Sequence, residues 1–399
     1  MKRLAKLFLL WIILLGVVAG CAQPQVKVAE AQSLKSDKPR ITSPDVTPEE
    51  VQELVRGNTA FAFDLYQTLQ KGSGGNLFFS PYSISIALAM TYAGARGETE
   101  QEMARALHFT LPQSRLHPAF NSLDLALRGQ AEQEEGFRLH IANALWGQRG
   151  YKFLREFLDT LAQNYGAGLM LLDFAGDPEG ARKTINDWIS DQTEGRIKEL
   201  IPKGMIDFLT RLVLTNAIYF KAAWAEPFAK ELTSDGTFHL LDGTKVTVPM
   251  MHQVTDLGYA EGEGYQAVEL PYKGEKMAMV IILPSGDFEA FEENLSAELV
   301  QKILQEMTYI PVDLTLPRFR VESDFRLAEA LKAMGMPTAF VPDKADFSGM
   351  DGTHKLCISD VLHKAFVSVD EEGTEAAAAT AVLMKVTAIR ITQAKVIVD

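Results

Sequence analysis

The sequence predicts an α+β fold, because helical patterns dominate its first half and strand patterns its second. Between residues 47 and 192 apolar side chains mostly recur at helical spacing, whereas short, alternating apolar runs follow from residue 211. The two kinds of segment do not alternate regularly, so a doubly wound parallel sheet is not expected. The chain has 399 residues, of which 47% are hydrophobic and 23% charged, and this is enough for a large buried core.

The first twenty residues are not expected to belong to the fold. A basic stretch, MKRLAK, precedes an apolar run that is short for a membrane span, and the small residues VAG lead directly to Cys21. Small residues before a cysteine resemble the processing site of bacterial lipoproteins. Residues 1–20 are therefore predicted to be a signal peptide and Cys21 the lipidated residue, which gives an exported protein anchored to the extracellular face of the bacterial cell envelope. The alternative is a signal peptide with an incidental cysteine.

The folded body is expected to begin at Thr47. Residues 21–46 are polar, contain several prolines and are predicted to be a flexible tether. The stretch T-P-E-E is typical of a helix start, with Thr47 as N-cap and Glu50 completing a capping box. Residues 47–399 would form one domain. Cys357 is the only other cysteine, so no intrachain disulfide is expected once Cys21 carries lipid.

Periodicity predicts the remaining elements. Helices are expected at 81–94, 98–107, 151–165, 177–192, 295–306 and 325–334. Strands are expected at 138–147, 211–221, 236–240, 245–252, 266–270, 277–283, 311–320 and 361–370.

The sequence offers no evident catalytic centre. The net charge of −13 disfavours nucleic acid as a partner. The histidines form neither an HExxH motif nor a zinc-ligand spacing, and a G-x-S-x-G elbow and a phosphate-binding loop are missing. The glycine-rich stretch 71–76 is expected to be a surface turn. We therefore expect neither an enzyme nor a bound metal or cofactor.

Five segments in a fixed order carry a family resemblance. They are NLFFSPYSISIALAMTYAGARGETEQEMARALHF (76–109), LVLTNAIYFKAAWAEPF (212–228), LPRFRVESDFRLAEALKAMGM (316–336), KADFSGM (344–350) and HKAFVSVDEEGTEAAAAT (363–380). In this order they resemble a serpin from about Thr47 to Asp399.

The resemblance implies three β-sheets, eight or nine helices and an exposed reactive-centre loop. A serine or cysteine protease would cleave this loop and stay attached to it as a covalent acyl-enzyme. The loop would then insert as a strand into the largest sheet and distort the protease, driven by the strain of a metastable native state. The protein would act as a monomeric suicide-substrate inhibitor; the alternative is a non-inhibitory serpin-fold lipoprotein that serves as a binding or scaffold protein.

The segment EEGTEAAAATAVLM (371–384) fits an inserting strand. Read at period two, one face is small and uncharged at its leading end, and Glu375 lies on the other. A charge on the buried face would cost several kcal/mol, and Gly373 would let the chain swing. The residues expected to act as the hinge are Glu371, Gly373, Thr374, Ala376, Ala378 and Thr380. Composition alone would also allow an alanine-rich surface helix or linker.

The scissile bond can be placed by two counts that disagree. Counting from Glu371 as is usual in the family gives Thr387–Ala388, which implies an elastase-like protease. Counting back from the chain end gives Arg390–Ile391, which implies a trypsin-like one, and Lys385 is a third candidate. The first count is preferred, because the length of the inserted strand is fixed mechanically.

Two further groups of residues match family positions. Ser80, Ser83, Asn216 and His363 match the polar cluster beneath the opening strands of the large sheet. Trp224 matches the tryptophan where the loop inserts. The simpler interpretations are a satisfied core histidine and a core aromatic residue.

Serpins normally continue beyond the residue that matches Asp399, into two buried strands. KVIVD resembles the start of a strand, so we expect an incomplete sequence, or alternatively a separate C-terminal piece. A chain that truly ended at Asp399 would be expected to fold poorly and to lack inhibitory activity.

Overall fold

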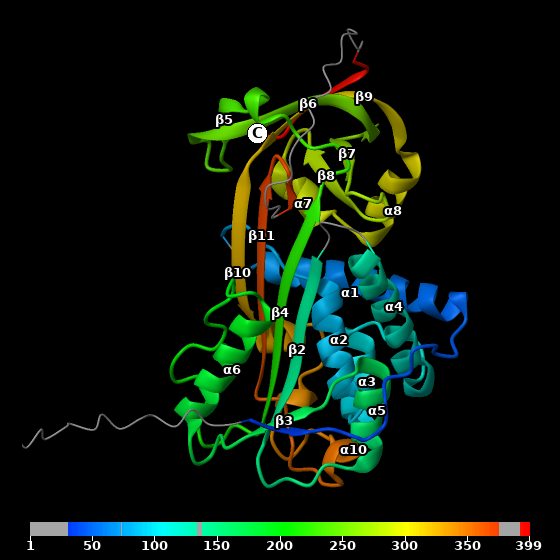
Figure 1. Cartoon of the computed structure of the whole chain (residues 1–399), viewed down its shortest axis with the longest axis vertical. Helices are drawn as coiled ribbons and strands as arrows, with labels where there is room; N and C mark the ends of the chain where they lie inside the picture. The colour runs from blue at the N-terminus through cyan, green and yellow to red at the C-terminus, as the bar shows by residue number, and fades with distance from the viewer. Residues whose placement is uncertain (1–30, 73, 134–137, 375–391) are drawn as a thin grey trace, which may run out of the picture.

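The computed structural model describes residues 31–72, 74–133, 138–374 and 392–399. A tall sheet runs the length of the molecule, helices pack against both of its faces, and a second sheet lies across one end (Figure 1). The predicted α+β class is confirmed. The described residues hold ten α-helices and two sheets, so the expected third sheet is not among them.

The bounds of the elements are as follows. The helices are α1 (Pro48–Gln70), α2 (Pro81–Tyr92), α3 (Gly97–Ala106), α4 (Gln113–Gln133), α5 (Arg155–Tyr165), α6 (Pro178–Gln192), α7 (Phe288–Glu293), α8 (Ala297–Glu306), α9 (Ala328–Ala333) and α10 (Ser348–Asp351). The strands are β1 (Gln32–Leu34), β2 (Arg138–Gln148), β3 (Leu169–Leu172), β4 (Leu212–Ala223), β5 (Ser234–His239), β6 (Lys245–Gly262), β7 (Tyr265–Pro271), β8 (Ala278–Pro284), β9 (Thr308–Pro317), β10 (Phe319–Arg326), β11 (Asp360–Asp370), β12 (Gly373–Thr374) and β13 (Ala394–Ile397).

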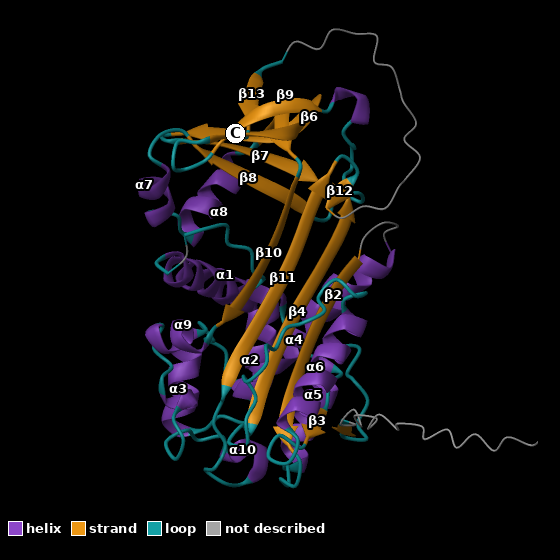
Figure 2. Cartoon of the chain, turned by 90° about the vertical axis from the view of Figure 1, so that its left-hand side faces the viewer, coloured by secondary structure: helices purple, strands orange, loops and turns teal. Residues whose placement is uncertain are grey.

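The large sheet has the order β1-β3-β2-β4-β12-β11-β10. Its central strands, β4 and β11, pair directly and in parallel. Residues Val213–Tyr219 of β4 are the partners of Asp360–Phe366 of β11. Beyond this stretch the short β12 lies between them and pairs antiparallel with both. Figure 2 shows β12 at the end of the sheet that adjoins the second sheet. The second sheet has the order β13-β9-β6-β7-β8, with β5 on the free part of β6.

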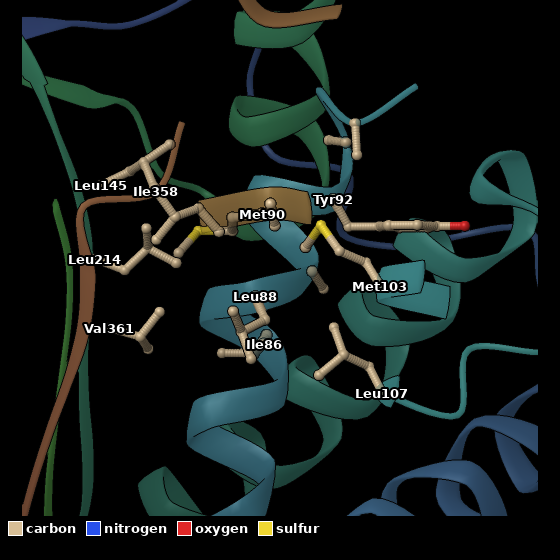
Figure 3. Close-up of a cluster of buried hydrophobic side chains, with 14 of the residues drawn as sticks. Ile86, Leu88, Met90, Tyr92, Met103, Leu107, Leu145, Leu214, Ile358 and Val361 are labelled. Atoms are coloured by element: carbon tan, nitrogen blue, oxygen red, sulfur yellow. The ribbon is translucent and has the colours of Figure 1, made fainter. Parts of the chain in front are cut away.

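Helix α2 forms the core behind the large sheet. Its sequence, PYSISIALAMTY, is apolar on nearly all sides, as expected of a helix that is buried all round. Figure 3 shows its side chains between those of the sheet and those of α3. The residues labelled there on α2, on the sheet, and on α3 or at its C-cap are Ile86, Leu88, Met90, Tyr92, Leu145, Leu214, Val361, Met103 and Leu107. On the opposite face of the sheet, α6 packs against β2 and β4.

The expected tether ends earlier than residue 46. Strand β1 pairs antiparallel with β3 at the edge of the large sheet. The Arg40 guanidinium donates to Asn121 Oδ1 at 2.8 Å and to Asp124 Oδ2 at 2.7 Å, and both of these residues are buried in α4. Residues 32–41 are therefore part of the folded body, and residues 21–30 lie outside the described part.

Several boundaries also differ from the sequence-based expectations. The single strand expected at 311–320 is two strands, β9 and β10, which Arg318 separates and which belong to different sheets. Strand β6 is 18 residues long and runs well past residue 252. The capping box at Thr47 is confirmed, with the backbone N–H of Thr47 donating to Glu50 at 2.8 Å.

Candidate functional site

A row of polar side chains crosses the large sheet at its centre. The sheet register places Asn143 of β2 beside Asn216 of β4, and Asn216 beside His363 of β11. All three side chains point to the face that α2 covers, because residues of one row share a face. The predicted cluster residues Ser80 and Ser83 lie at the start of α2, where Ser80 is the N-cap.

These five residues form one hydrogen-bonded network. The backbone N–H of Ser80 donates to His363 Nε2 at 3.2 Å, and His363 Nδ1 donates to Asn216 Oδ1. The Asn216 amide donates in turn to Ser83 Oγ and Asn143 Oδ1. Asn143 Nδ2 closes the network by donating to the Ser83 carbonyl at 3.3 Å. Asn143 was not among the predicted site residues, although it lies on the strand predicted at 138–147.

His363 is neutral and serves as a positioning group. It is fully buried, and this burial lowers its pKa to about 3. One ring nitrogen accepts from Ser80 and the other donates to Asn216, so both are occupied in a single neutral tautomer. The ring stacks on Phe325 of β10 at 6.1 Å. No ring nitrogen remains for proton transfer, which argues against a catalytic role.

The upper end of the β4–β11 pair is organised by Trp224. Its indole stacks on Tyr272 at 4.9 Å, and its Nε1 donates to the Asp370 carbonyl at 3.0 Å. Its backbone N–H donates to the Glu372 carbonyl at 3.0 Å. Trp224 therefore holds the turn between β11 and β12 in place. That Trp224 marks the place where the loop inserts stays a prediction.

Thr374 is buried between the two central strands. Its register partners are Ala222 of β4 and Val369 of β11. Its hydroxyl lies 2.8 Å from that of Tyr272, and the side chain is fully buried. The sequence analysis missed Tyr272, because it lies in an isolated bridge that no local pattern marks.

A glycine is required at position 373 because the backbone of β4 lies close to it and because of its backbone angle. Its φ is +154°, and a Cβ there would lie 2.1 Å from the Ala222 carbonyl oxygen and 2.7 Å from Ala223 Cα. Any other residue would force β12 out of its place.

Glu371 anchors the start of the hinge. Its carboxylate accepts from Arg318 Nε at 2.8 Å and from the Thr233 hydroxyl at 2.6 Å. Burial opposes its ionisation, but these two hydrogen bonds, a backbone hydrogen bond and the positive charge of Arg318 together hold its pKa below the usual value. Its carbonyl accepts from the Phe228 N–H at 2.9 Å. Arg318 is the residue that separates β9 from β10, so the turn between β11 and β12 is tied to both sheets.

Other predicted site residues lie outside the described residues. They are the hinge residues Ala376, Ala378 and Thr380, the bond candidates Thr387, Ala388, Arg390 and Ile391 with Lys385, and the lipidation candidate Cys21. The description resumes at Thr392, and β13 then pairs with β9 at the same end of the molecule as β12.

Within the described ranges, no group of three or more histidine, cysteine, aspartate or glutamate side chains could hold a metal ion. No helix in that part of the chain is long and apolar enough to cross a membrane.

Comparison with known proteins gives a consistent result. A family model described as Serpin (serine protease inhibitor) matches residues 56–399. An uncharacterised serpin-like protein of Thermococcus kodakarensis is 46% identical over 84% of this chain and 77% of its own. The leukocyte elastase inhibitor of Homo sapiens is 42% identical over 83% of this chain and 89% of its own. The native state of the thermophilic serpin tengpin matches with a TM-score of 0.80 at 27% identity, over 93% of this chain and 94% of its own.

Proposed function

The chain belongs to the serpin family, and we propose that it inhibits a serine protease, or alternatively a cysteine protease, as a monomeric suicide substrate. The nucleophile of the protease attacks a loop carbonyl carbon between residues 385 and 390, and the C–N bond breaks. The new amine leaves with a proton, and an ester or thioester joins the loop to the protease. The loop then inserts between β4 and β11 before water can release the protease.

The observation that carries this proposal is the place of β12. It already lies between β4 and β11, antiparallel to both. Extending that register would place each of residues 377–383 opposite one pair of the β4–β11 ladder. Thr380 would fall opposite Asn216 and His363, and Leu383 opposite Val213 and Asp360, where the ladder ends. Residues 377–383 therefore match the closed part of the ladder in length.

The same extended register supports the two faces predicted for residues 371–384. Ala376, Ala378 and Thr380 would share the face of Thr374, which α2 covers. Their neighbours on β4 would be Phe220, Ile218 and Asn216. The close-packed interior has room there for methyl groups. A larger side chain would overpack it and destabilise the inserted state by roughly 1–3 kcal/mol. Insertion replaces one parallel ladder by two antiparallel ones, which pair somewhat more stably per residue.

Incubation with a panel of serine proteases tests the proposal. We expect a complex that survives SDS and boiling, and a cleaved chain that unfolds at a higher temperature than the intact one. Mass spectrometry of the released peptide would place the bond at Thr387–Ala388 or at Arg390–Ile391. Cleavage without a complex and without a gain in thermal stability would contradict inhibition and favour a binding role.

We also propose that Cys21 carries lipid and anchors the exported protein to the cell envelope. The support is the basic, apolar and small-residue sequence of residues 1–21. Cys21→Ser is expected to move the protein from the membrane fraction to the soluble fraction. Equal membrane retention of both proteins would contradict anchoring through Cys21.

A further inference from the structure

We propose that Phe208 and Leu209, at the tip of the loop between α6 and β4, contact the surface of the bilayer to which the chain is anchored. The proposal rests on the proposed lipid anchor for the nearness of a membrane, and on the loop itself for the contact. It places the molecule upright on the membrane, with its hinge at the far end.

The two side chains form an exposed apolar pair. Phe208 is 64% exposed and Leu209 is 63% exposed. Single exposed apolar residues are common and need no explanation. Leu240 and Leu241 on the β5–β6 hairpin, 40% and 76% exposed, are a second adjacent pair, so a membrane contact at Phe208 and Leu209 is favoured by their place near the end of the chain that leads to Cys21.

The tip is held rigidly away from the body. The Asp207 carboxylate accepts from the backbone N–H groups of Leu209 and Thr210 at 2.9 and 3.0 Å. Arg211 donates to the Phe208 carbonyl at 2.8 Å, which closes the turn from the other side. Ile206, just before the turn, is buried in the core beneath α6. The exposure of the pair is therefore fixed by the fold.

The anchored end of the chain emerges beside this tip. Ala31, the first described residue, packs in the same cluster as Met205 of the loop. The sheet register aligns Gln32 of β1 with Leu171 of β3, Gly147 of β2 and Leu212 of β4. At the usual spacing between strands, Gln32 and Leu212 are therefore about 14 Å apart. The chain from Cys21 to Ala31 can span at most about 35 Å when fully extended. A lipid on Cys21 would hold the bilayer within reach of the tip.

The negative charge of the chain bears on how the tip would contact the bilayer. The whole chain has a net charge of −13, and loss of residues 1–20, with Lys2, Arg3 and Lys6, would make the anchored protein more negative still. Anionic headgroups would repel it, so attraction depends on apolar insertion. Lys203 and Arg211 lie close to the tip in the sequence, and Asp207, the exposed acid of the turn, accepts hydrogen bonds from backbone N–H groups through one carboxylate oxygen. Interfacial contacts of this kind place side chains about 5–10 Å into the boundary between headgroups and acyl chains.

The arrangement also fits the proposed inhibition. Strands β12 and β13 lie at the end opposite β1 and β3 (Figures 1 and 2), so a docked molecule would present its loop away from the membrane. The inserted strand would carry a trapped protease toward the tip, because Leu383 would reach the lower end of β4. A bulky protease there would lift the tip from the bilayer.

Quenching of tryptophan fluorescence by lipids with brominated acyl chains tests the contact. Phe208→Trp places the probe at the tip, and Leu241→Trp is the matched control, because Leu241 is 76% exposed on the β5–β6 hairpin at the other end. In phosphatidylcholine vesicles that carry the lipidated chain, we expect quenching about twofold stronger for the tip variant. Equal quenching of the two vesicle-bound variants would overturn the proposal.

A second experiment distinguishes a missing tip contact from a missing lipid anchor. If the purified chain carries no lipid, the Cys21 thiol can be coupled to a maleimide lipid in a Cys357→Ser background, and the same two probes compared. Leu209→Trp provides an independent probe of the tip. Unequal quenching on coupled vesicles would support the tip contact even where natural lipidation has failed.

Discussion

His363 of β11 donates a hydrogen bond to Asn216 of β4 across the line along which the large sheet would open. The same two residues connect, through Ser80 and Ser83, to the start of α2. Extending the register of β12 would place Thr380 between them. The bond that closes the sheet would then be exchanged for bonds to the inserted strand.

Thr374→Arg should turn the inhibitor into a substrate. Thr374 is fully buried and contacts Tyr272, so an arginine would have to carry an unpaired charge into the sheet, at a cost of several kcal/mol. The ratio of cleaved chain to covalent complex, measured on SDS gels, should rise sharply. Thr374→Ser keeps the hydroxyl and should behave as the wild type. Normal complex formation by the arginine variant would contradict insertion at Thr374.

Acid should destabilise the native state partly through His363. The folded pKa is about 3 and the unfolded value about 6.5, so between these pH values the unfolded chain binds more protons. The free energy of unfolding therefore falls as the pH falls through this window. His363→Gln should reduce the loss between pH 7 and pH 4 by about 3 kcal/mol, measured by urea unfolding at both values. Identical losses in the two proteins would show that His363 does not contribute, since His117, which shifts in the same direction, is present in both.

Removal of the Glu371 carboxylate should weaken the hinge anchor. Glu371→Ala leaves Arg318 and Thr233 without their shared acceptor, and we expect a loss of about 2–3 kcal/mol in the free energy of unfolding. The control is Lys230→Ala, which breaks the neighbouring ion pair with Glu372. The Lys230 side chain is 60% exposed, so this loss should be much smaller than that for Glu371→Ala. Similar losses for both variants would argue against a special role for Glu371.

Gly373→Ala should expel β12 from between β4 and β11. The added methyl group would overlap the Ala222 carbonyl oxygen, which belongs to the backbone and cannot move aside. Hydrogen exchange at Trp224, whose N–H donates to Glu372, should become faster by at least about tenfold. Gly129→Ala in α4 meets nothing within 4 Å and should leave this exchange unchanged. Unchanged exchange in the Gly373 variant would contradict the proposed place of β12.

The family resemblance pointed to Ser80, Ser83, Asn216, His363 and Trp224, because they lie within or beside the long segments that carry it. It missed Asn143, Tyr272 and Arg318, because their roles depend on which distant strands are neighbours in a sheet. Local periodicity defines the faces of a strand but not its partners.

The missed elements have similar physical reasons. Helix α4 contains Pro118, which lacks a backbone donor and interrupts a helical pattern, yet the helix continues through it against α1 and α5. Strand β1 has only the residues QSL, and it forms because the edge of β3 offers backbone partners. Strands β9 and β10 read as one run because only Arg318 separates them.

The most direct test of loop insertion between β4 and β11 is to link these two strands covalently. Ala217 and Lys364 are register partners across β4 and β11, so a disulfide between cysteines at these two positions would hold the strands together. In a Cys357→Ser background, the oxidised Ala217→Cys/Lys364→Cys protein should be cleaved by the target protease without trapping it, and reduction should restore the covalent complex. Equal complex formation in the oxidised and reduced states would contradict insertion between β4 and β11.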